Sequence, residues 1–324
     1  MVDLDGLPGP DLAAAAAVRA RAASVLRPAG ALARLDTVAT WLAGWQRTCR
    51  PAVRRPACVV FVADHGVAVR AVSAYPASVT PEMLRALQAG RATAAVLAGQ
   101  VGARIEVVDV GVGRPTDDLV EGPALDEVRF EECWHAGSEA VRRLDADLVV
   151  LGEMGIANTT AAAAVAAALF GGPVEDWVGR GTGVDDAGLA RKRDAVAAAV
   201  ERVSGAAPLE VLRHCGGAEL VAMAAATVEA RRRSIPVVLD GFVNTAAVAT
   251  LEVARAGALD HCIAGHRSPE PGHRLLLERL GKEPLLDLGL RLGEASGALL
   301  AVPLVRMAAA AVVEVATFEE WGVA

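Results

Sequence analysis

Aromatic side chains are scarce in this sequence of 324 residues, where Phe, Trp and Tyr together make up 3%. Hydrophobic residues nevertheless make up 53%, so Ala, Val and Leu must fill the interior. This inventory suits alanine-rich helices that pack closely on a sheet. The length predicts one large domain, or one large and one small domain.

The sequence also lacks an excess of basic residues, with 39 acidic and 32 basic side chains and a net charge of −7. Nucleic-acid binders concentrate Lys and Arg on one surface. The two short basic runs here, 191–193 and 231–233, are interpreted as solvated helix ends. We therefore expect small-molecule partners and no nucleic acid.

Paired cysteines are absent as well: the five cysteines are an odd number and include no CxxC. This pattern disfavours a disulfide framework and a zinc ribbon. Cys133 lies two residues before His135, but no second ligand pair accompanies them. We predict no metal site and no cofactor.

Long apolar runs of the kind that cross a bilayer are lacking, because the longest ones are short and rich in alanine. The N-terminal stretch MVDLDGLPGPD is acidic and has no apolar core of a signal peptide. The sequence predicts a cytoplasmic protein without a membrane contact.

Short apolar runs alternate with helical segments and predict an α/β fold with a mostly parallel sheet. The predicted strands lie in the segments 57–67, 104–113, 146–160, 235–250 and 260–273. The helical pattern of 11–47, broken at 27–30, and the last segment lie outside this alternation. We predict a large α/β domain over 50–290 and a small helical subdomain from 1–49 and 291–324.

Polar residues follow each predicted strand, in the strings ADHG, VGVG, LGEMGIANTT, LDGF and AGHRS. Ligands of such folds bind at the carboxyl ends of the strands. The five strings therefore predict one composite site at one edge of the sheet.

The string LGEMGIANTT is the most informative of these loops. Gly152 and Gly155 permit tight turns, and Asn158, Thr159 and Thr160 open a helix. The free N–H groups of a helix N-terminus attract an anion such as phosphate, although simple capping by these side chains is the alternative. The loop lacks the GK[ST] ending of a Walker A motif and the GxGxxG fingerprint of dinucleotide sites.

A second glycine-rich loop, VGRGTGVDD, contains Gly181 and Gly183. Asp185 and Asp186 stand where a helix begins; such a pair can hold magnesium, but helix-start carboxylates are commoner. Lys192, about two turns later, could neutralise a phosphate on the first loop.

Three further loop residues have two interpretations. Asp64, His65 and Asp240 could act as bases or ligands, or could satisfy neighbouring backbone groups. No G-x-S-x-G elbow supports a hydrolase triad.

The string RLGEASGALLA places Glu294 among small residues. Small residues allow the backbone or a ligand to approach closely, and a partly dehydrated carboxylate has a raised pKa that suits a general base. The alternative is a carboxylate at a helix N-terminus.

Taken together, these strings resemble the nicotinate-nucleotide–dimethylbenzimidazole phosphoribosyltransferase family. The strings that carry the resemblance run in order from about residue 25 to the end, and they include FVADHGVAVRAVSAYPASVT, VVDVGV, LGEMGIANTT, VGRGTGVDDAGLARK, GHRSPEPGHR, LGEASGA and ATFEEWGV.

The resemblance implies transfer of phosphoribose from nicotinate mononucleotide to 5,6-dimethylbenzimidazole, in the assembly of the cobalamin nucleotide loop. The products are α-ribazole 5′-phosphate and nicotinate, with inversion at C1′. It also implies a homodimer with a Rossmann-like sheet and a small helical domain, and Glu294 as the catalytic base. Glu153, matched to the nucleotide site, is predicted to stabilise an oxocarbenium-like centre.

The predicted site divides into two parts. The residues expected to hold the nucleotide are Gly152, Gly155, Asn158, Thr159, Thr160, Gly181, Gly183, Lys192, Asp240, Gly265 and His266. The residues expected around the acceptor are Asp64, His65, Tyr75 and Met83.

Three features depart from the family pattern: the N-terminal string LRPAGALARLD differs from the usual one, Ala295 stands where glycine is usual, and Gly265 where serine is common. The departure at Gly265 suggests the loss of one hydrogen bond to a ligand. Two alternatives follow, namely a phosphoribosyltransferase of the same fold with another benzimidazole, purine or phenolic acceptor, and a catalytically idle nucleotide-binding homologue.

Overall fold

Five parallel strands form the single sheet of the computed structural model, which describes residues 3–323. Their order across the sheet is β2-β1-β3-β4-β5, and every pair is parallel. The strands are β1 (Pro56–Ala63), β2 (Arg104–Gly111), β3 (Leu148–Met154), β4 (Val237–Leu239) and β5 (Cys262–Ala264). All five predicted strands are present, and the predicted α/β class with a parallel sheet is confirmed.

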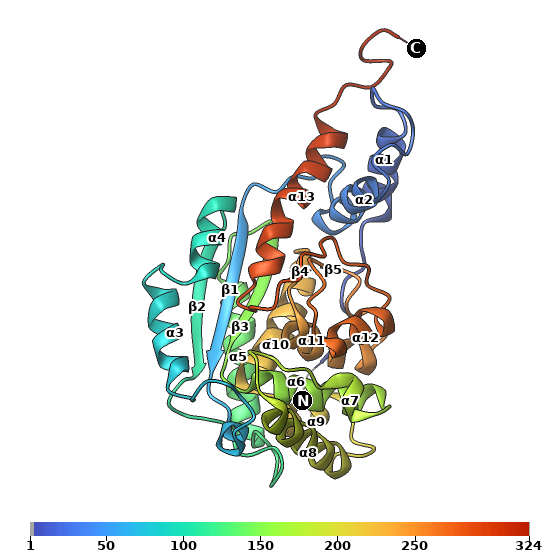
Figure 1. Cartoon of the computed structure of the whole chain (residues 1–324). Coiled ribbons are helices and arrows are strands. Elements are labelled where there is room, and N and C mark those ends of the chain that lie inside the picture. Colours follow the sequence, from blue (N-terminus) through green and yellow to red (C-terminus); the bar gives the residue numbers. More distant parts are fainter. Residues whose placement is uncertain (1–2, 324) are drawn as a thin grey trace.

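Helices fill the connections between the strands (Figure 1). Before β2 lie α1 (Leu12–Ala22), α2 (Arg34–Gln46), the 3₁₀ helix η1 (Gly66–Arg70), α3 (Val79–Gln88) and α4 (Thr93–Val101). Between β2 and β4 lie α5 (Glu127–Arg142), α6 (Asn158–Phe170), α7 (Val174–Trp177), α8 (Asp186–Arg202), α9 (Pro208–Cys215) and α10 (Ala218–Arg232). After β4 come α11 (Phe242–Ala254), α12 (Pro271–Arg279) and α13 (Ser296–Val313).

Strand β1 is buried at every position because helices cover both faces of the sheet. Val59 and Phe61 belong to the core cluster that also contains residues of α5, α6, α10 and α11. Val60 and Val62 point to the opposite face and belong to the cluster with residues of α2, α4 and α13. The alternation of side chains along a strand thus builds two cores from one continuous apolar run.

The scarcity of aromatic residues is met by close packing of small ones. The helix α5 approaches α10 so closely that a Cβ at Gly137 would lie 2.0 Å from the carbonyl oxygen of Ala222. All alanines from 161 to 167 on α6 are also buried. Alanine-rich helices therefore pack tightly on the sheet, as the composition indicates.

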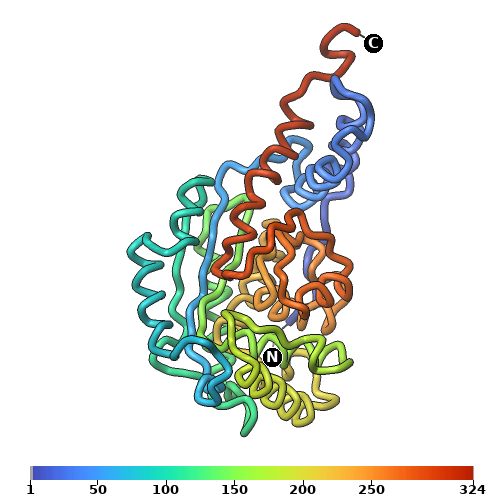
Figure 2. The backbone as a smooth tube through the Cα atoms, in the orientation of Figure 1, coloured from blue at the N-terminus to red at the C-terminus, as the bar shows by residue number. Residues whose placement is uncertain are grey.

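Helices from the first and last parts of the chain lie together, although the N-terminus itself lies far from the C-terminus (Figure 2). Helices α1 and α2 pack against the C-terminal half of α13, and Val25 pairs with Thr317 in an antiparallel bridge. The N-terminal half of α13 lies against the sheet, so this helix joins the terminal helices to the core of the sheet (Figure 1). The division at 49/50 and 290/291 stays a prediction.

Helix α13 is long and apolar enough to cross a membrane by length and composition, yet 56% of it is buried inside the protein. A core helix has the same properties, so α13 is weak support for a membrane span.

Candidate active site

A cavity of about 370 Å³ opens at the carboxyl ends of β3, β4 and β5. Three of the five polar loops line it, together with the segment 290–294 and residues between 72 and 83. The expectation of one composite site at this edge is therefore met by three loops and not by five.

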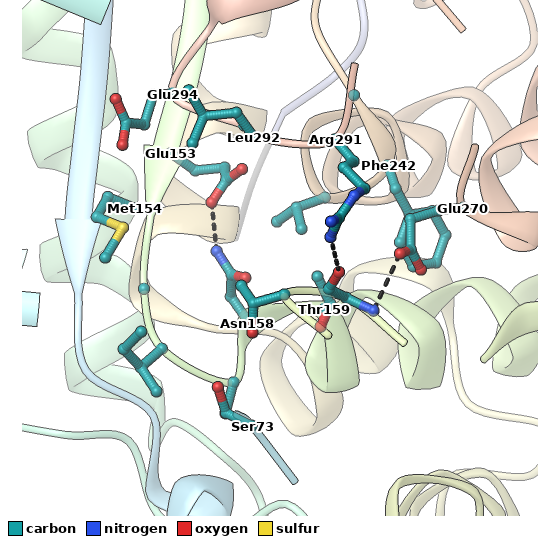
Figure 3. Close-up of a pocket in the computed structure, with 18 of the residues that line it drawn as sticks. Ser73, Glu153, Met154, Asn158, Thr159, Phe242, Glu270, Arg291, Leu292 and Glu294 are labelled. Atoms are coloured by element: carbon teal, nitrogen blue, oxygen red, sulfur yellow. Dashed lines mark hydrogen bonds between the residues drawn. The ribbon is translucent and has the colours of Figure 1, made fainter. Parts of the chain in front are cut away.

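The cavity has two chemically different ends (Figure 3). Met154, Leu292 and the carboxylate of Glu294 lie at one end, while Thr159, Glu270 and Arg291 lie at the other. Glu153 and Asn158 stand between them. One end carries Met154, Leu292 and a single carboxylate, and the other carries the charged and polar groups, with Phe242 beside Glu270.

Glu294 is 3% exposed and lies in the turn before α13. Its N–H donates to the carbonyl oxygen of Glu153 at 3.2 Å, and its Oε2 accepts from the N–H of Ala94 at 3.5 Å. Burial, together with the charge of Asp240, raises the pKa of Glu294, and the bond from Ala94 opposes the shift. The expected burial of this carboxylate away from water is confirmed. Glu294 also lies two residues before the start of α13, so the helix N-terminus of the alternative interpretation is present as well.

The small residues around Glu294 have a steric cause. A Cβ at Gly152 would lie 2.5 Å from the backbone nitrogen of Ala295 and 2.6 Å from the carbonyl carbon of Glu294. The segment that carries Glu294 therefore rests directly on the backbone of β3. Gly152 does not line the cavity; it lies beneath this segment.

Glu294 and Ala295 both adopt left-handed backbone conformations, with φ values of 60° and 67°. Such a conformation costs an alanine about 1–2 kcal/mol relative to glycine. The methyl group of Ala295 is fully buried, which contributes about 0.8 kcal/mol in return. The departure from glycine at position 295 is therefore accommodated with little net strain.

Glu153 is the second buried carboxylate of the cavity. Its Oε2 accepts a hydrogen bond from the side-chain amide of Asn158. Burial raises the pKa of Glu153 well above its ordinary value, and the carboxylates of Glu219, Asp240 and Glu294 add to the shift. A Cβ at Gly293 would lie 2.4 Å from Glu153 Oε1, so this glycine makes room for the carboxylate.

Helix α6 begins at Asn158 without a side-chain cap. Its first flanking residue, Ala157, has φ 78°, and the side chain of Asn158 turns to Glu153 instead of capping the helix. The capping interpretation of this string is therefore wrong. The N-terminus of α6 faces the cavity with its positive dipole end.

The neighbours of Asn158 differ in their roles. Thr159 lines the cavity, and its Oγ1 accepts from Lys192 Nζ at 2.9 Å. Thr160 is fully buried and does not line the cavity. Gly155 lines it, and a Cβ there would lie 2.8 Å from the carbonyl oxygen of Ala63.

Lys192 points from α8 into the cavity although it is 1% exposed. Its Nζ also donates to the carbonyl oxygen of Gly179 at 3.0 Å. Burial lowers the pKa of Lys192 to about 8, and the carboxylate of Glu270 opposes the shift. The predicted orientation of Lys192 toward the first loop is confirmed by its bond to Thr159.

The second glycine-rich loop contributes Gly181 but not Gly183 to this cavity. Asp185 caps α8 by accepting from the N–H of Gly188 at 2.7 Å, and Asp186 pairs with Arg180. The helix-start interpretation of the two aspartates fits these contacts. Within residues 3–323, no group of three or more His, Cys, Asp or Glu side chains is arranged to hold a metal ion.

Asp64 and His65 do not line the cavity, which corrects their assignment to the acceptor. Asp64 Oδ2 accepts from the N–H of Gly113 at 2.8 Å, so the loops after β1 and β2 bind each other. His65 turns inward, where its Nε2 lies 2.6 Å from Oε1 of the buried Glu219. Both residues satisfy neighbouring groups and close the edge of the sheet.

Asp240 and Gly265 likewise lie behind the cavity wall, whereas His266 lines it. Asp240 Oδ1 accepts from the N–H of Ala298 at 2.9 Å, which satisfies the first turn of α13, and lies 3.5 Å from His266 Nε2. Asp240 thus supports the helix that follows Glu294.

Gly265 sits where no side chain fits. A Cβ there would lie 2.8 Å from the Cα of Ala298 and 3.0 Å from the carbonyl oxygen of Leu239. A serine at this position would meet α13 and not a ligand in the cavity, so the expected loss of a ligand hydrogen bond is not supported.

Replacing Gly265 by serine is therefore expected to lower the free energy of unfolding by about 1–3 kcal/mol through overpacking, without tighter nucleotide binding. Urea denaturation measures the effect. Gly122→Ser is the control, because no atom lies within 4 Å of a Cβ built at that position. Unchanged stability together with tighter nucleotide binding would contradict the expectation.

Tyr75 and Met83 line the cavity, as predicted; Tyr75 is 54% exposed at its rim. Other lining residues with chemical functions were not expected from the sequence, namely Ser73, Arg180, Thr182, Ser268, Glu270 and Arg291. Glu270 and Arg291 stand inside the strings SPEPGH and RLGE, which were available as signals.

Comparison with known proteins agrees with this geometry. The profile of the phosphoribosyltransferase family matches residues 7–323. A protein of Cereibacter sphaeroides named nicotinate-nucleotide–dimethylbenzimidazole phosphoribosyltransferase is 50% identical over 99% of this chain and 95% of its own length. The chain belongs to the nicotinate-nucleotide–dimethylbenzimidazole phosphoribosyltransferase family.

Further members of this family extend the match. A protein of the same name from Ruegeria pomeroyi is 49% identical over 99% of this chain and 95% of its own length. The crystal structure of CobT from Thermus thermophilus superimposes with a TM-score of 0.93 at 45% identity, over 96% of this chain and 99% of that chain. The chain is therefore a phosphoribosyltransferase with the fold of this family.

Proposed function

We propose that this enzyme transfers phosphoribose from nicotinate mononucleotide to 5,6-dimethylbenzimidazole, giving α-ribazole 5′-phosphate and nicotinate. The observation that carries the proposal is a single cavity with a buried carboxylate at its apolar end and an uncapped helix N-terminus beside a lysine at its other end. These two ends match an aromatic acceptor and a phosphate.

The phosphate is placed at the polar end. The N-terminus of α6 offers N–H groups and a positive dipole end, which suit an anion. Lys192 Nζ lies beside Thr159 at this terminus, and Arg291 reaches the carbonyl oxygen of Gly181 at 3.4 Å. The phosphate binds away from the reacting atoms, and its binding here fixes the ribose for attack at C1′.

The acceptor is placed at the apolar end, against Glu294. Dimethylbenzimidazole is flat and mostly apolar, and the side chains of Met154 and Leu292 lie at this end (Figure 3). Glu294 is the polar group that meets a ring nitrogen there.

The chemistry requires one base and no general acid. One ring nitrogen of the acceptor donates its lone pair to C1′ while the bond from C1′ to the nicotinate nitrogen breaks. That electron pair returns to the pyridinium ring, so nicotinate leaves without a proton. The second ring nitrogen loses its proton to Glu294, and attack from the opposite face inverts C1′ from β to α.

Glu153 is assigned to the sugar. Positive charge develops at C1′ as the two C–N bonds exchange, and a nearby carboxylate stabilises it. Glu153 lies between the two ends of the cavity, beside Asn158 (Figure 3). A cationic ribose there would favour the ionised form of Glu153, against the raised pKa that burial gives it.

Lys192→Met tests the phosphate end. The substitution removes the ammonium and keeps an apolar chain of similar length, so nicotinate mononucleotide should bind about 10- to 100-fold more weakly, as expected for a lost charge-assisted hydrogen bond. Calorimetric titration measures the binding.

Lys282→Met is the matched control, because Lys282 Nζ also donates to two backbone carbonyls, at 2.7 and 2.9 Å, outside the cavity. An unchanged dissociation constant in Lys192→Met would remove Lys192 from phosphate binding.

The deciding experiment is turnover of nicotinate mononucleotide with dimethylbenzimidazole, followed by chromatography of nicotinate and α-ribazole phosphate. A panel of other benzimidazoles, adenine and phenols is run in parallel. Product with dimethylbenzimidazole supports the proposal, and product only with another acceptor would transfer the assignment to that acceptor. Nucleotide binding without any product would identify an idle homologue.

We also propose that the enzyme forms a homodimer and acts in the cytoplasm. Light scattering after size-exclusion chromatography tests the dimer, and fractionation of cells tests the location.

A further inference from the structure

The carboxylate of Glu270 lies against the second glycine-rich loop at the polar end of the cavity (Figure 3). Its Oε1 accepts from the N–H of Gly181 at 3.0 Å. Its Oε2 is buried without a hydrogen-bond partner. A Cβ at Gly179 would lie 1.9 Å from this oxygen, so glycine at 179 is what admits the carboxylate.

Lys192 holds the same loop from another direction. Its Nζ donates to the carbonyl oxygen of Gly179 at 3.0 Å and to Thr159 Oγ1 at 2.9 Å. An ammonium group has three N–H donors, so one remains for a further acceptor. A Cβ at Gly181 would lie 3.3 Å from this Nζ, which places the ammonium directly beside the loop that Glu270 binds.

The charge of Glu270 acts on Lys192 against the effect of burial. Burial lowers the pKa of Lys192 to about 8, and the carboxylate of Glu270 is the charge that raises it. A neutral amine would offer no charge to a phosphate dianion, so the charge state of Lys192 contributes to the affinity of this end for phosphate.

Other charged groups occur on the elements around Lys192. They are Asp185, Asp186, Arg191, Arg193 and Asp194 on and before α8, Arg180 and Arg291 at the glycine-rich loop, Glu175 and Asp176 on α7, Arg70 on η1, and Glu153 and His266 across the cavity. Arg180 pairs with Asp186, and Arg70 pairs with Asp118 and Glu121.

We propose that Glu270 is a positioning residue for phosphate binding: its carboxylate holds the peptide of Gly181 in the loop that Lys192 also binds, so that Lys192 meets the substrate phosphate as an ammonium. This role rests on the proposed function of the cavity. It explains why a partly buried carboxylate stands where an anionic substrate must bind, since without it the buried lysine would lose its proton at a lower pH.

Glu270→Gln tests the proposal because glutamine keeps an acceptor for Gly181 and removes the charge. The dissociation constant of nicotinate mononucleotide is measured by calorimetry from pH 6.5 to 9. Affinity is high while Lys192 is charged and falls as pH rises through its pKa. Loss of one nearby charge should move the fall in affinity about one pH unit lower. Relative to the wild type, Glu270→Gln should then bind the nucleotide about eightfold more weakly at pH 8.5 and less than about twofold more weakly at pH 6.5.

Glu278→Gln is the matched control, since Glu278 lies on the neighbouring helix α12, pairs with Arg274 and is exposed. Its pH profile should coincide with that of the wild type. An equal loss of affinity at every pH in Glu270→Gln would overturn the proposal, because a purely structural role has no pH dependence.

Glu270→Asp provides a second, independent test of the proposal if the glutamine variant does not fold. Aspartate keeps the charge and shortens the reach to Gly181, so affinity should fall evenly while the pH of the fall stays that of the wild type. A shift of about one pH unit in this variant would also overturn the role of Glu270. Failure of the wild type itself to bind nicotinate mononucleotide would instead refute the proposed function.

Discussion

Replacing Glu294 by glutamine is expected to lower turnover by about a hundredfold to ten-thousandfold, the usual contribution of a general base. Glutamine fills the same space beside Ala94 but cannot take the proton of the acceptor. Nicotinate mononucleotide should bind as before, because its phosphate is placed at the other end of the cavity (Figure 3). Initial rates and calorimetric titration separate the two effects.

The pH dependence of the wild type provides a second measurement of this role. Glu294 must be ionised to accept a proton, so kcat/KM should rise with pH through the pKa of Glu294. Burial raises that pKa above its ordinary value of 4.5, so the rise should come at a higher pH than for an exposed glutamate. Glu294→Gln should lose this rising limb.

Glu314→Gln is the control, because Glu314 is an exposed glutamate at the end of the same helix, α13. It should retain wild-type turnover. Wild-type turnover in Glu294→Gln would reject Glu294 as the base, whereas loss of nucleotide binding would indicate that the substitution disturbs the whole cavity.

Replacing Gly152 by alanine is expected to lower turnover by about a hundredfold although Gly152 itself does not line the cavity. The added Cβ would lie 2.5 Å from the nitrogen of Ala295 and 2.6 Å from the carbonyl carbon of Glu294. Both contacts are with backbone, so the segment that carries Glu294 must move away from β3. A displacement of about 1 Å is enough for such a loss.

The same crowding should lower the free energy of unfolding by about 1–3 kcal/mol, as measured in urea. Gly99→Ala is the matched control: it lies in α4, and no atom is within 4 Å of a Cβ built there. Alanine is the better helix former by about 1 kcal/mol, so this variant should be stable and active. Full activity in Gly152→Ala would mean that the placement of Glu294 does not depend on this contact.

Local patterns in the sequence determined the architecture. Four of the five strands are short, mostly apolar runs, β2 also carries charged residues, and β1 is buried along its whole length. Parallel strands end at a common edge, so the string LGEMGIANTT was expected near a ligand, and the cavity lies there. The start of α8 at Asp185 and Asp186 could also be predicted locally, because aspartate is a preferred residue at a helix N-terminus.

The dehydration of Glu294 could also be expected from sequence, because glycine and alanine surround it and leave room for close packing. The partner that requires this room could not. Gly152 lies more than a hundred positions earlier in the chain, and only the folded sheet brings its backbone against Ala295.

Only the tertiary structure decided which polar loop residues face the cavity. His65 turns away because it meets Glu219, 154 positions later in the chain, and Glu270 enters because it meets Gly181, 89 positions earlier. A side chain takes the direction in which its polar atoms find partners once water is excluded. The sequence by itself therefore determined the fold, the family and the place of the site, while contacts between distant residues decided the composition of its walls.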